Sequence, residues 1–255
     1  MLVRSIPLTE PLAISAVPLE RDDFAPFGDV VANPRPGSTP SNTAPEAIAR
    51  GELPYGAVSA NQGTAIQYKE LASMRDLYGK ARSRKPGSPR MTMYVCGART
   101  LVSRGGEREA KAKADSIEIK VLERHPFTTQ TFIPLTADGT KRYLVVVAPT
   151  LDPTSEDEDL PVPDEGEIVG LQRPGLPDLT GLTAFVATGE QGVTYGAGTW
   201  HAPMIALGPP DSTVDFVVVQ FANDVPVEDC QEVAIEGADA EGEAEAARIW
   251  VRVPE

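Results

Sequence analysis

The sequence predicts an all-β protein with a few short helices. From Met91 onward, short runs rich in β-branched and aromatic residues alternate with turn residues, a pattern typical of strands joined by loops. These runs are MTMYVC, SIEIKVLE, QTFIPL, KRYLVVVA, LTAFVAT and VDFVVVQFA. The dipeptide Asp138-Gly139 separates QTFIPL from KRYLVVVA and predicts a tight antiparallel hairpin between them. An apolar fraction of 41% in 255 residues is enough to fill a sizeable core.

The part of the chain before Met91 predicts fewer and shorter elements. Residues 1–16 contain two prolines and are interpreted as an N-terminal extension. The stretch ERDDFAPFGDVV, residues 20–31, predicts a helical turn followed by a strand. Residues 32–54 are rich in Pro, Ser, Asn and Thr and predict an irregular loop. Residues 57–68 predict a short β segment that turns at Gly63.

An acidic segment interrupts the strand-rich part of the chain. Residues 150–178 contain SEDED and several prolines, and their apolar content is too low for a core. We therefore expect an exposed insertion between two strands. With no internal repeat in the sequence, we expect a single domain over residues 1–255.

Charge and cysteine usage restrict the partners and the compartment. A formal charge of −14 argues against nucleic acid or an anionic membrane as a partner. Cys96 and Cys230 lie far apart in the sequence, which favours free thiols in a reducing compartment. The N-terminus lacks the apolar core of a signal peptide, and no apolar run approaches the roughly 18 to 20 residues of a membrane span. We expect a soluble, cytoplasmic protein.

The two histidines of the chain each lie in a strand-like stretch punctuated by Gly or Pro. His125 lies in VLERHPFTTQTFIPL, and His201 lies in GEQGVTYGAGTWHAP. Residues two apart in a strand share a face, so Glu123 and His125 can point to the same side. We expect the two stretches to meet in space and to carry the chemistry.

Both stretches resemble the two motifs of the cupin barrels, HxHx(3,4)E and PxGxxH. Glu123 stands where the first motif has a histidine, Gln130 stands for its acid, and Gly196 replaces the proline of the second. The resemblance implies a cupin-like double-stranded β-helix, or jelly-roll, barrel. In cupins the equivalent positions bind a divalent metal, so it also implies that Glu123, His125, Gln130 and His201 are the metal ligands if an ion is present.

Four blocks of the chain, in the same order, resemble the ureidoglycolate lyase family, whose members are also called ureidoglycolate hydrolases. The blocks are PLERDDFAPFGDVV, NQGTAIQY, ERHPFTTQTFIPL and TGEQGVTYGAGTWHAP. The Pro-rich loop and the acidic segment resemble insertions of a fungal-type branch. Membership implies a cupin-like homodimer that splits ureidoglycolate into glyoxylate and urea during allantoin degradation.

The chemistry of this reaction suits the residue types near the two histidines. Ureidoglycolate is a carbinolamide, so its cleavage needs a base for the hydroxyl proton and an acid for the departing ureido nitrogen. A histidine can serve either role near neutral pH. We expect His125 or Glu123 to be the base and His201 to be the acid.

Five further residues are expected to contact the substrate. Amide groups can hold its ureido or carboxylate oxygens, and aromatic rings can wall the site. The candidates are Gln130, Asn61, the backbone of Gly63, Tyr195 and Trp200. Each also has a purely structural interpretation, as a satisfied polar group or a core aromatic.

Three alternative functions remain open from the sequence. An amidohydrolase acting on the same substrate would release ammonia instead of urea. A metal-dependent cupin enzyme is disfavoured by the loss of two standard ligands, and a non-catalytic cupin that binds a ligand is disfavoured by the polar candidate residues. The strand edges of runs such as VDFVVVQFA predict a homodimer, because pairing between copies covers exposed edges.

Overall fold

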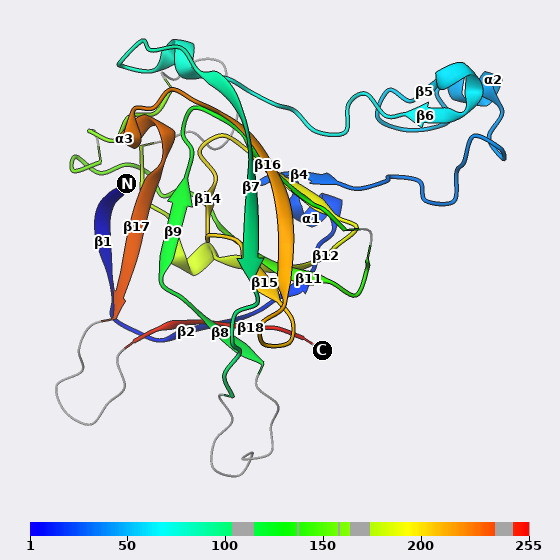
Figure 1. The fold of residues 1–255 in the computed structure, drawn as a ribbon. Coiled ribbons are helices and arrows are strands. Elements are labelled where there is room, and N and C mark those ends of the chain that lie inside the picture. Colours follow the sequence, from blue (N-terminus) through cyan, green and yellow to red (C-terminus); the bar gives the residue numbers. More distant parts are fainter. Residues whose placement is uncertain (104–114, 137, 158, 164–173, 238–246, 255) are drawn as a thin grey trace.

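The structure is a computed structural model that describes residues 1–103, 115–136, 138–157, 159–163, 174–237 and 247–254. Strands dominate this part of the chain, which confirms the predicted mostly-β class (Figure 1). The described helices are single turns or little more: α1 (Arg21–Phe24), α2 (Pro45–Ala49), α3 (Pro226–Asp229), η1 (Asn61–Gly63), η2 (Tyr78–Lys80) and η4 (Leu179–Gly181). None of the described helices has the length and apolar character that a membrane crossing needs.

The largest sheet has eight strands and brings the two histidine segments together. In spatial order its strands are β1 (Leu2–Leu8), β17 (Gln231–Gly237), β9 (Val121–Arg124), β14 (Trp200–His201), β11 (Arg142–Ala148), β12 (Thr183–Thr188) and β3 (Val17–Pro18), with β15 (Ile205–Leu207) also paired to β11. The antiparallel pairing of β9 with β14 sets Glu123 directly opposite His201. This register positions the candidate site.

A five-stranded sheet packs against one face of the large sheet. Its strands, in spatial order, are β4 (Gly28–Val31), β13 (Gly192–Tyr195), β10 (Gln130–Pro134), β16 (Thr213–Ala222) and β7 (Ser88–Gly97). Its buried side includes Phe132 and Phe216, which lie in one core cluster with Tyr143 and Phe185 of the large sheet. Alternate residues of β10 and β16 therefore point into the space between the sheets.

A three-stranded sheet covers the other face of the large sheet. It consists of β2 (Leu12–Ser15), β18 (Ile249–Arg252) and β8 (Ser116–Ile119). Ile117 and Ile249 share a core cluster with Leu144 and Val146, while their neighbour Val145 belongs to the core on the opposite face. Residues 1–16, interpreted from the sequence as an extension, thus supply β1 and β2 to two of the sheets.

Residues 33–72, here called the arm, project away from the sheets (Figure 1, cyan). The arm carries α2 and a two-stranded sheet of β5 (Val58–Ala60) and β6 (Ala65–Gln67). The expected β segment with a turn at Gly63 is confirmed. The expected irregular loop of residues 32–54 instead contains α2, whose Ile48 is buried.

Two strand-pairing predictions are wrong. The turn at Asp138 forms, but β10 and β11 on its two sides belong to different sheets and do not pair with each other. The run VDFVVVQFA is not an edge, because β16 lies between β10 and β7, and β7 is the edge strand. Turn residues specify a reversal of the chain, but side-chain burial on both faces decides which sheet the next strand joins.

The acidic segment is more closely packed than its composition predicts. Asp157 and Leu160 are buried, and the carbonyl oxygen of Gly175 accepts hydrogen bonds from Arg124 and from the Trp200 indole. Residues 158 and 164–173 of this segment lie outside the described part of the chain. The expectation of a wholly exposed insertion is therefore wrong for the described residues, because backbone carbonyls there satisfy buried donors of the large sheet.

Candidate active site

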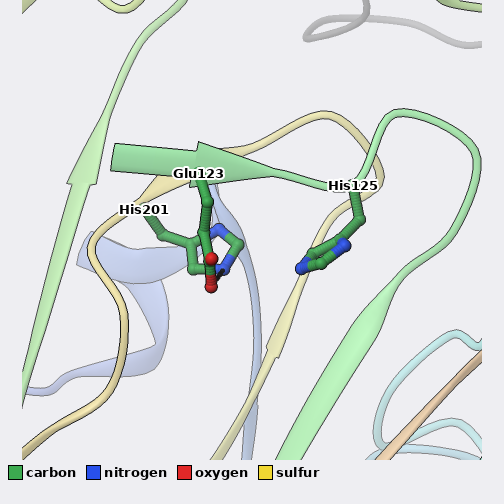
Figure 2. Close-up of side chains that lie close together, drawn as sticks. All are labelled: Glu123, His125 and His201. Atoms are coloured by element: carbon green, nitrogen blue, oxygen red, sulfur yellow. Dashed lines mark ion pairs between the residues drawn. The ribbon is translucent and has the colours of Figure 1, made fainter. Parts of the chain in front are cut away.

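Glu123, His125 and His201 converge beside the pairing of β9 with β14 (Figure 2). One ligand-type atom from each of the three lies within 4.8 Å of the others. Glu123 Oε1 is 3.6 Å from His201 Nε2, and the two imidazole ring centroids are 5.6 Å apart. The structure therefore brings together the three residues expected to carry the chemistry.

Each imidazole is oriented by a backbone carbonyl behind it. His201 Nδ1 lies 2.9 Å from the carbonyl oxygen of Thr199, and His125 Nδ1 lies 2.6 Å from that of Asp229. Because a carbonyl can only accept, each Nδ1 carries the proton, and a neutral ring has its lone pair on Nε2. Both Nε2 atoms are buried and have no hydrogen-bond partner among the described residues. Two buried Nε2 atoms thus face the same small space as a carboxylate.

Local backbone geometry holds the two histidine segments in register. Gly198 adopts φ +80°, a left-handed conformation that glycine reaches without steric cost. Its N–H donates to the carbonyl oxygen of His125 at 2.8 Å. The Gly-rich sequence before His201 therefore serves to tie this segment to the end of β9.

A second group of residues fixes the carbonyl behind His125. The Tyr78 hydroxyl donates to Asp229 Oδ1 at 2.6 Å, and the Asn223 N–H donates to the same oxygen at 2.8 Å. Burial and then the Asp229 hydrogen bond raise the pKa of Tyr78, so this phenol stays protonated as a donor. These contacts hold Asp229, and through its backbone they hold His125.

The electrostatics separate the protonation states within the site. Burial, and next the charge of His201, lower the pKa of His125 to about 4, so this ring is neutral at pH 7. Burial alone would raise the pKa of Glu123, but the nearby His201 and then His125 outweigh it and leave that pKa below its usual value. Glu123 is therefore an anion beside His201.

Tyr195 borders this group, and Gln130 is its cross-strand neighbour. The Tyr195 ring stacks on the His201 ring with centroids 3.9 Å apart and planes at 11°. Gln130 lies opposite Tyr195 in the β10–β13 pairing, and its Nε2 donates to Gln220 Oε1 at 2.7 Å. Gln130 Oε1 and the Tyr195 hydroxyl are buried with no hydrogen-bond partner in the described residues. Both atoms remain available to a ligand.

Trp200 has a different position from the one expected. Successive strand residues face opposite sides, so its indole lies away from His201 and is completely buried in the core. The Arg124 guanidinium lies 4.5 Å from the centre of the indole ring, and this arginine is also completely buried. Trp200 therefore supports β14 from behind and does not line the space between the histidines.

Asn61 and Gly63 are not brought to the histidines within one chain. Both lie in η1 at the tip of the arm, which Figure 1 shows well away from β9 and β14. Asn61 and Gly63 are exposed there. Their expected contact with the substrate remains a prediction.

Cys230 and Tyr94 are two neighbours of Glu123 that the sequence alone does not indicate. Cys230 Sγ is 3.9 Å from Glu123 Oε2, and burial together with the Glu123 charge raises the pKa of this thiol to about 12. Burial, and then the charge of Glu123, raise the pKa of Tyr94, which lies on β7. The alternation in MTMYVC indicates that Tyr94 and Cys96 share a face, but only the sheet order shows that this face borders the site.

The same three side chains fit a divalent cation. Two imidazoles and one carboxylate form a donor set that suits first-row transition metals. Metal-bound histidines commonly donate their other ring N–H to a backbone carbonyl, as His125 and His201 do here. The buried group of Glu123, His125 and His201 could therefore bind a metal.

The fold and the site define a sheet-on-sheet β protein with a buried carboxylate–imidazole centre, the kind of centre that enzymes use for proton transfer or metal binding. Residues 11–240 match the family model described as "Ureidoglycolate lyase". The chain belongs to the ureidoglycolate lyase family, whose members are carbon–nitrogen lyases.

Named relatives cover most of the chain. A ureidoglycolate lyase of Schizosaccharomyces pombe is 33% identical over 219 residues, which cover 86% of this chain and 89% of the relative. The Saccharomyces cerevisiae enzyme of that name is 35% identical over 177 residues, which cover 68% and 75%. A Burkholderia cepacia relative of the same name is 32% identical over 222 residues, which cover 86% and 85%. The match therefore extends to fungal and bacterial proteins.

Proposed function

We propose that this protein cleaves ureidoglycolate into glyoxylate and urea at the site formed by Glu123, His125 and His201, within a cupin-like jelly roll built from the two large sheets. One observation carries the proposal: the Nε2 atoms of both histidines are buried without a partner in the described residues and lie beside an ionised carboxylate. A site that leaves two lone pairs unpaired in this way is suited to a ligand with protons to exchange.

His125 is the base in this scheme. Its neutral ring takes the hydroxyl proton of the substrate on Nε2, and the O–H electron pair becomes the second bond of the new aldehyde carbonyl. The carbon–nitrogen bond breaks as that carbonyl forms, and its electron pair moves to the ureido nitrogen. A positioned base of this kind contributes a factor of roughly 10² to 10⁴ in rate.

His201 is the acid. It acts as the acid when its Nε2 carries a proton, and the anionic Glu123 lies 3.6 Å from that atom. That ring gives its proton to the departing nitrogen, so urea leaves as a neutral molecule. His125 gains one proton and His201 loses one, and transfer between these neighbouring rings restores the starting state.

Gln130 and Tyr195 would hold the substrate. The partnerless Gln130 Oε1 accepts a hydrogen bond from the ureido N–H groups, and the Tyr195 hydroxyl donates one to an oxygen. Burial raises the pKa of Tyr195 well above its usual value, so its hydroxyl remains a donor. These two contacts would set the orientation of the substrate between the rings.

A divalent cation, if present, would be held by Glu123, His125 and His201, with Gln130 Oε1 as a further oxygen donor. When bound, such an ion supplies Lewis-acid polarisation of a substrate oxygen. The protein ligands would then orient the substrate, and their Nε2 atoms would no longer carry the transferred proton.

The proposal is tested by the products. The purified protein is given racemic ureidoglycolate, and urea, glyoxylate and ammonia are followed separately. We expect urea and glyoxylate to appear in equal amounts without ammonia. At most one of the two enantiomers should be consumed at the full rate. Release of ammonia would instead indicate an amidohydrolase, and a folded protein without turnover would indicate a ligand-binding module.

The same assay after treatment with a chelator shows whether the histidines act as acid and base or as metal ligands. The acid–base scheme predicts that the ion-free protein still turns over, because both rings keep a free Nε2. An absolute requirement for a returned divalent cation would contradict it and assign His125 and His201 as ligands. The metal content of the protein, measured before and after treatment, is the control.

A further inference from the structure

The arm has few contacts with its own chain. At its roots the Ser73 N–H donates to Asp29 Oδ2 at 3.2 Å, and Arg21 lies 5.2 Å from the centre of the Tyr55 ring. Beyond these contacts the arm projects outward with its two-stranded sheet (Figure 1). A two-stranded hairpin is marginally stable on its own in water. The arm therefore needs a further surface against which to pack.

The backbone at the tip of the arm has an unusual conformation for an exposed segment. Asn61, Gln62 and Gly63 have consecutive positive φ angles of 46°, 58° and 89°. This conformation is costly for Gln62 in particular and usually persists where surrounding structure requires it, as at ligand clamps. Since both amide side chains are exposed, the tip presents polar groups to something outside this chain.

The five-stranded sheet exposes an apolar surface that no described residue covers. Its edge strand β7 exposes Met91, Met93 and Val95 at 75%, 59% and 64%, and these residues alternate along the outer face. Ile133 of β10 is 39% exposed, and it lies opposite Val217 on the same face. Long apolar edge strands and apolar patches of this kind mark interaction surfaces.

The site lies just behind this edge. Tyr94, on the inner face of β7, has its ring centroid 5.8 Å from that of Phe132. Phe132 in turn lies 6.1 Å from Tyr195, whose ring stacks on His201 at 3.9 Å. The substrate carries a carboxylate of its own, which the Glu123 anion repels. Additional N–H donors at this side of the site would offset that repulsion. Asn61 and Gln62 are donors of this type, located on an arm that has few contacts with the other described residues of its chain.

We propose that a second copy of the chain packs on the outer face of the five-stranded sheet, and that the partner's Asn61 and the partner's Gln62 reach round β7 to complete the site. The proposal rests on the lyase function proposed above. Each active site would then contain residues from both chains of the dimer.

The sheet order supports this arrangement. β4, from which the arm departs, and β7 form the two edges of the same sheet. When two such sheets pack face to face about a two-fold axis parallel to their strands, β4 of each copy lies across from β7 of the other. Stacked sheets are about 10 Å apart, and extended chain advances about 3.3 Å per residue, so the arm is long enough to pass round the edge.

The placement of the arm is tested without any activity. A photo-crosslinking amino acid replaces Gln62, and the products are separated by mass and mapped by peptide sequencing. We expect a crosslink between chains to the peptide that contains Tyr94. The same label at Glu10, an exposed residue outside the arm and β7, should give no such product. Crosslinks of Gln62 only within one chain, or none between chains, would overturn the proposal.

Shared sites are tested with mixed dimers. A His201→Ala chain and an Asn61→Ala/Gln62→Ala chain carry different tags, are produced together, and the mixed dimers are isolated by both tags. We expect each mixed dimer to work at about half the wild-type rate, because one of its two sites is intact. Mixed dimers no faster than the two parents, or an arm variant with the full wild-type rate, would overturn the proposal.

The matched control combines two chains whose substitutions both lie outside the arm. Mixed dimers of His201→Ala with His125→Ala contain no intact site in any arrangement, so they should stay as slow as their parents. If the wild-type protein itself lacks lyase activity, the proposed function fails, and the crosslinking result alone decides the placement of the arm. The two failures are thus distinguishable.

Discussion

His125→Ala and His201→Ala are each expected to lower kcat by about 10²-fold or more. Either change removes one of the two buried Nε2 atoms and leaves a required proton transfer to water. The measurement is the initial rate of urea release at saturating ureidoglycolate, with circular dichroism to confirm folding. The affinity for glyoxylate should fall by a smaller factor than kcat, because Gln130 and Tyr195 remain in place to hold the ligand.

The double variant shows whether the two rings act together. When two groups work as one unit, removing both costs little more than removing one. The factor by which kcat falls in the double variant should therefore be far smaller than the product of the two single factors. A His201→Ala protein that is folded and retains near wild-type kcat would contradict the acid role and leave this histidine as a structural residue.

Trp200→Ala is expected to destabilise the protein by about 3–5 kcal/mol, the range for large-to-small changes in a packed core. Its indole is completely buried, donates to the Gly175 carbonyl oxygen at 3.3 Å and lies beneath the Arg124 guanidinium. The cavity would loosen β14 next to His201. Urea denaturation followed by circular dichroism gives the change in free energy of unfolding.

Trp250→Ala is the matched control, because this indole is only half-buried on β18 and the same atoms are removed. Its cost should be clearly smaller. The conservative Trp200→Phe should keep kcat within a few-fold of wild type, since the ring does not face the substrate. A stable Trp200→Ala protein that loses kcat would place the indole in the site after all.

Strand character was predictable because it is a local property, and the meeting of the two histidine segments, which are far apart in the sequence, was predictable because both resemble paired cupin motifs. Alternation in VLER places Glu123 and His125 on one face, and the Gly-rich turn at Gly198 indicates a close approach of backbone. The motif spacing then required only that the two stretches meet, as they do at Glu123 opposite His201.

Features that depend on distant contacts were not predictable. The sequence shows that Trp200 is aromatic and next to His201, but alternation turns it into the core, where the buried Arg124 covers it. The turn residues at Asp138 predict a hairpin, but the strands on their two sides join different sheets. The position of Asn61 on an arm that projects from the sheets is not indicated by any local pattern around it.

A crystal structure of the protein with glyoxylate bound tests the proposed site most directly. We expect the ligand between the Nε2 atoms of His125 and His201, with one oxygen in hydrogen-bond reach of Tyr195. In His201→Ala crystals soaked under the same conditions, glyoxylate should occupy the same position at lower occupancy, because Gln130 and Tyr195 remain in place. Glyoxylate bound elsewhere in the wild-type protein, with nothing between the two histidines, would contradict the central claim that this site carries out the cleavage.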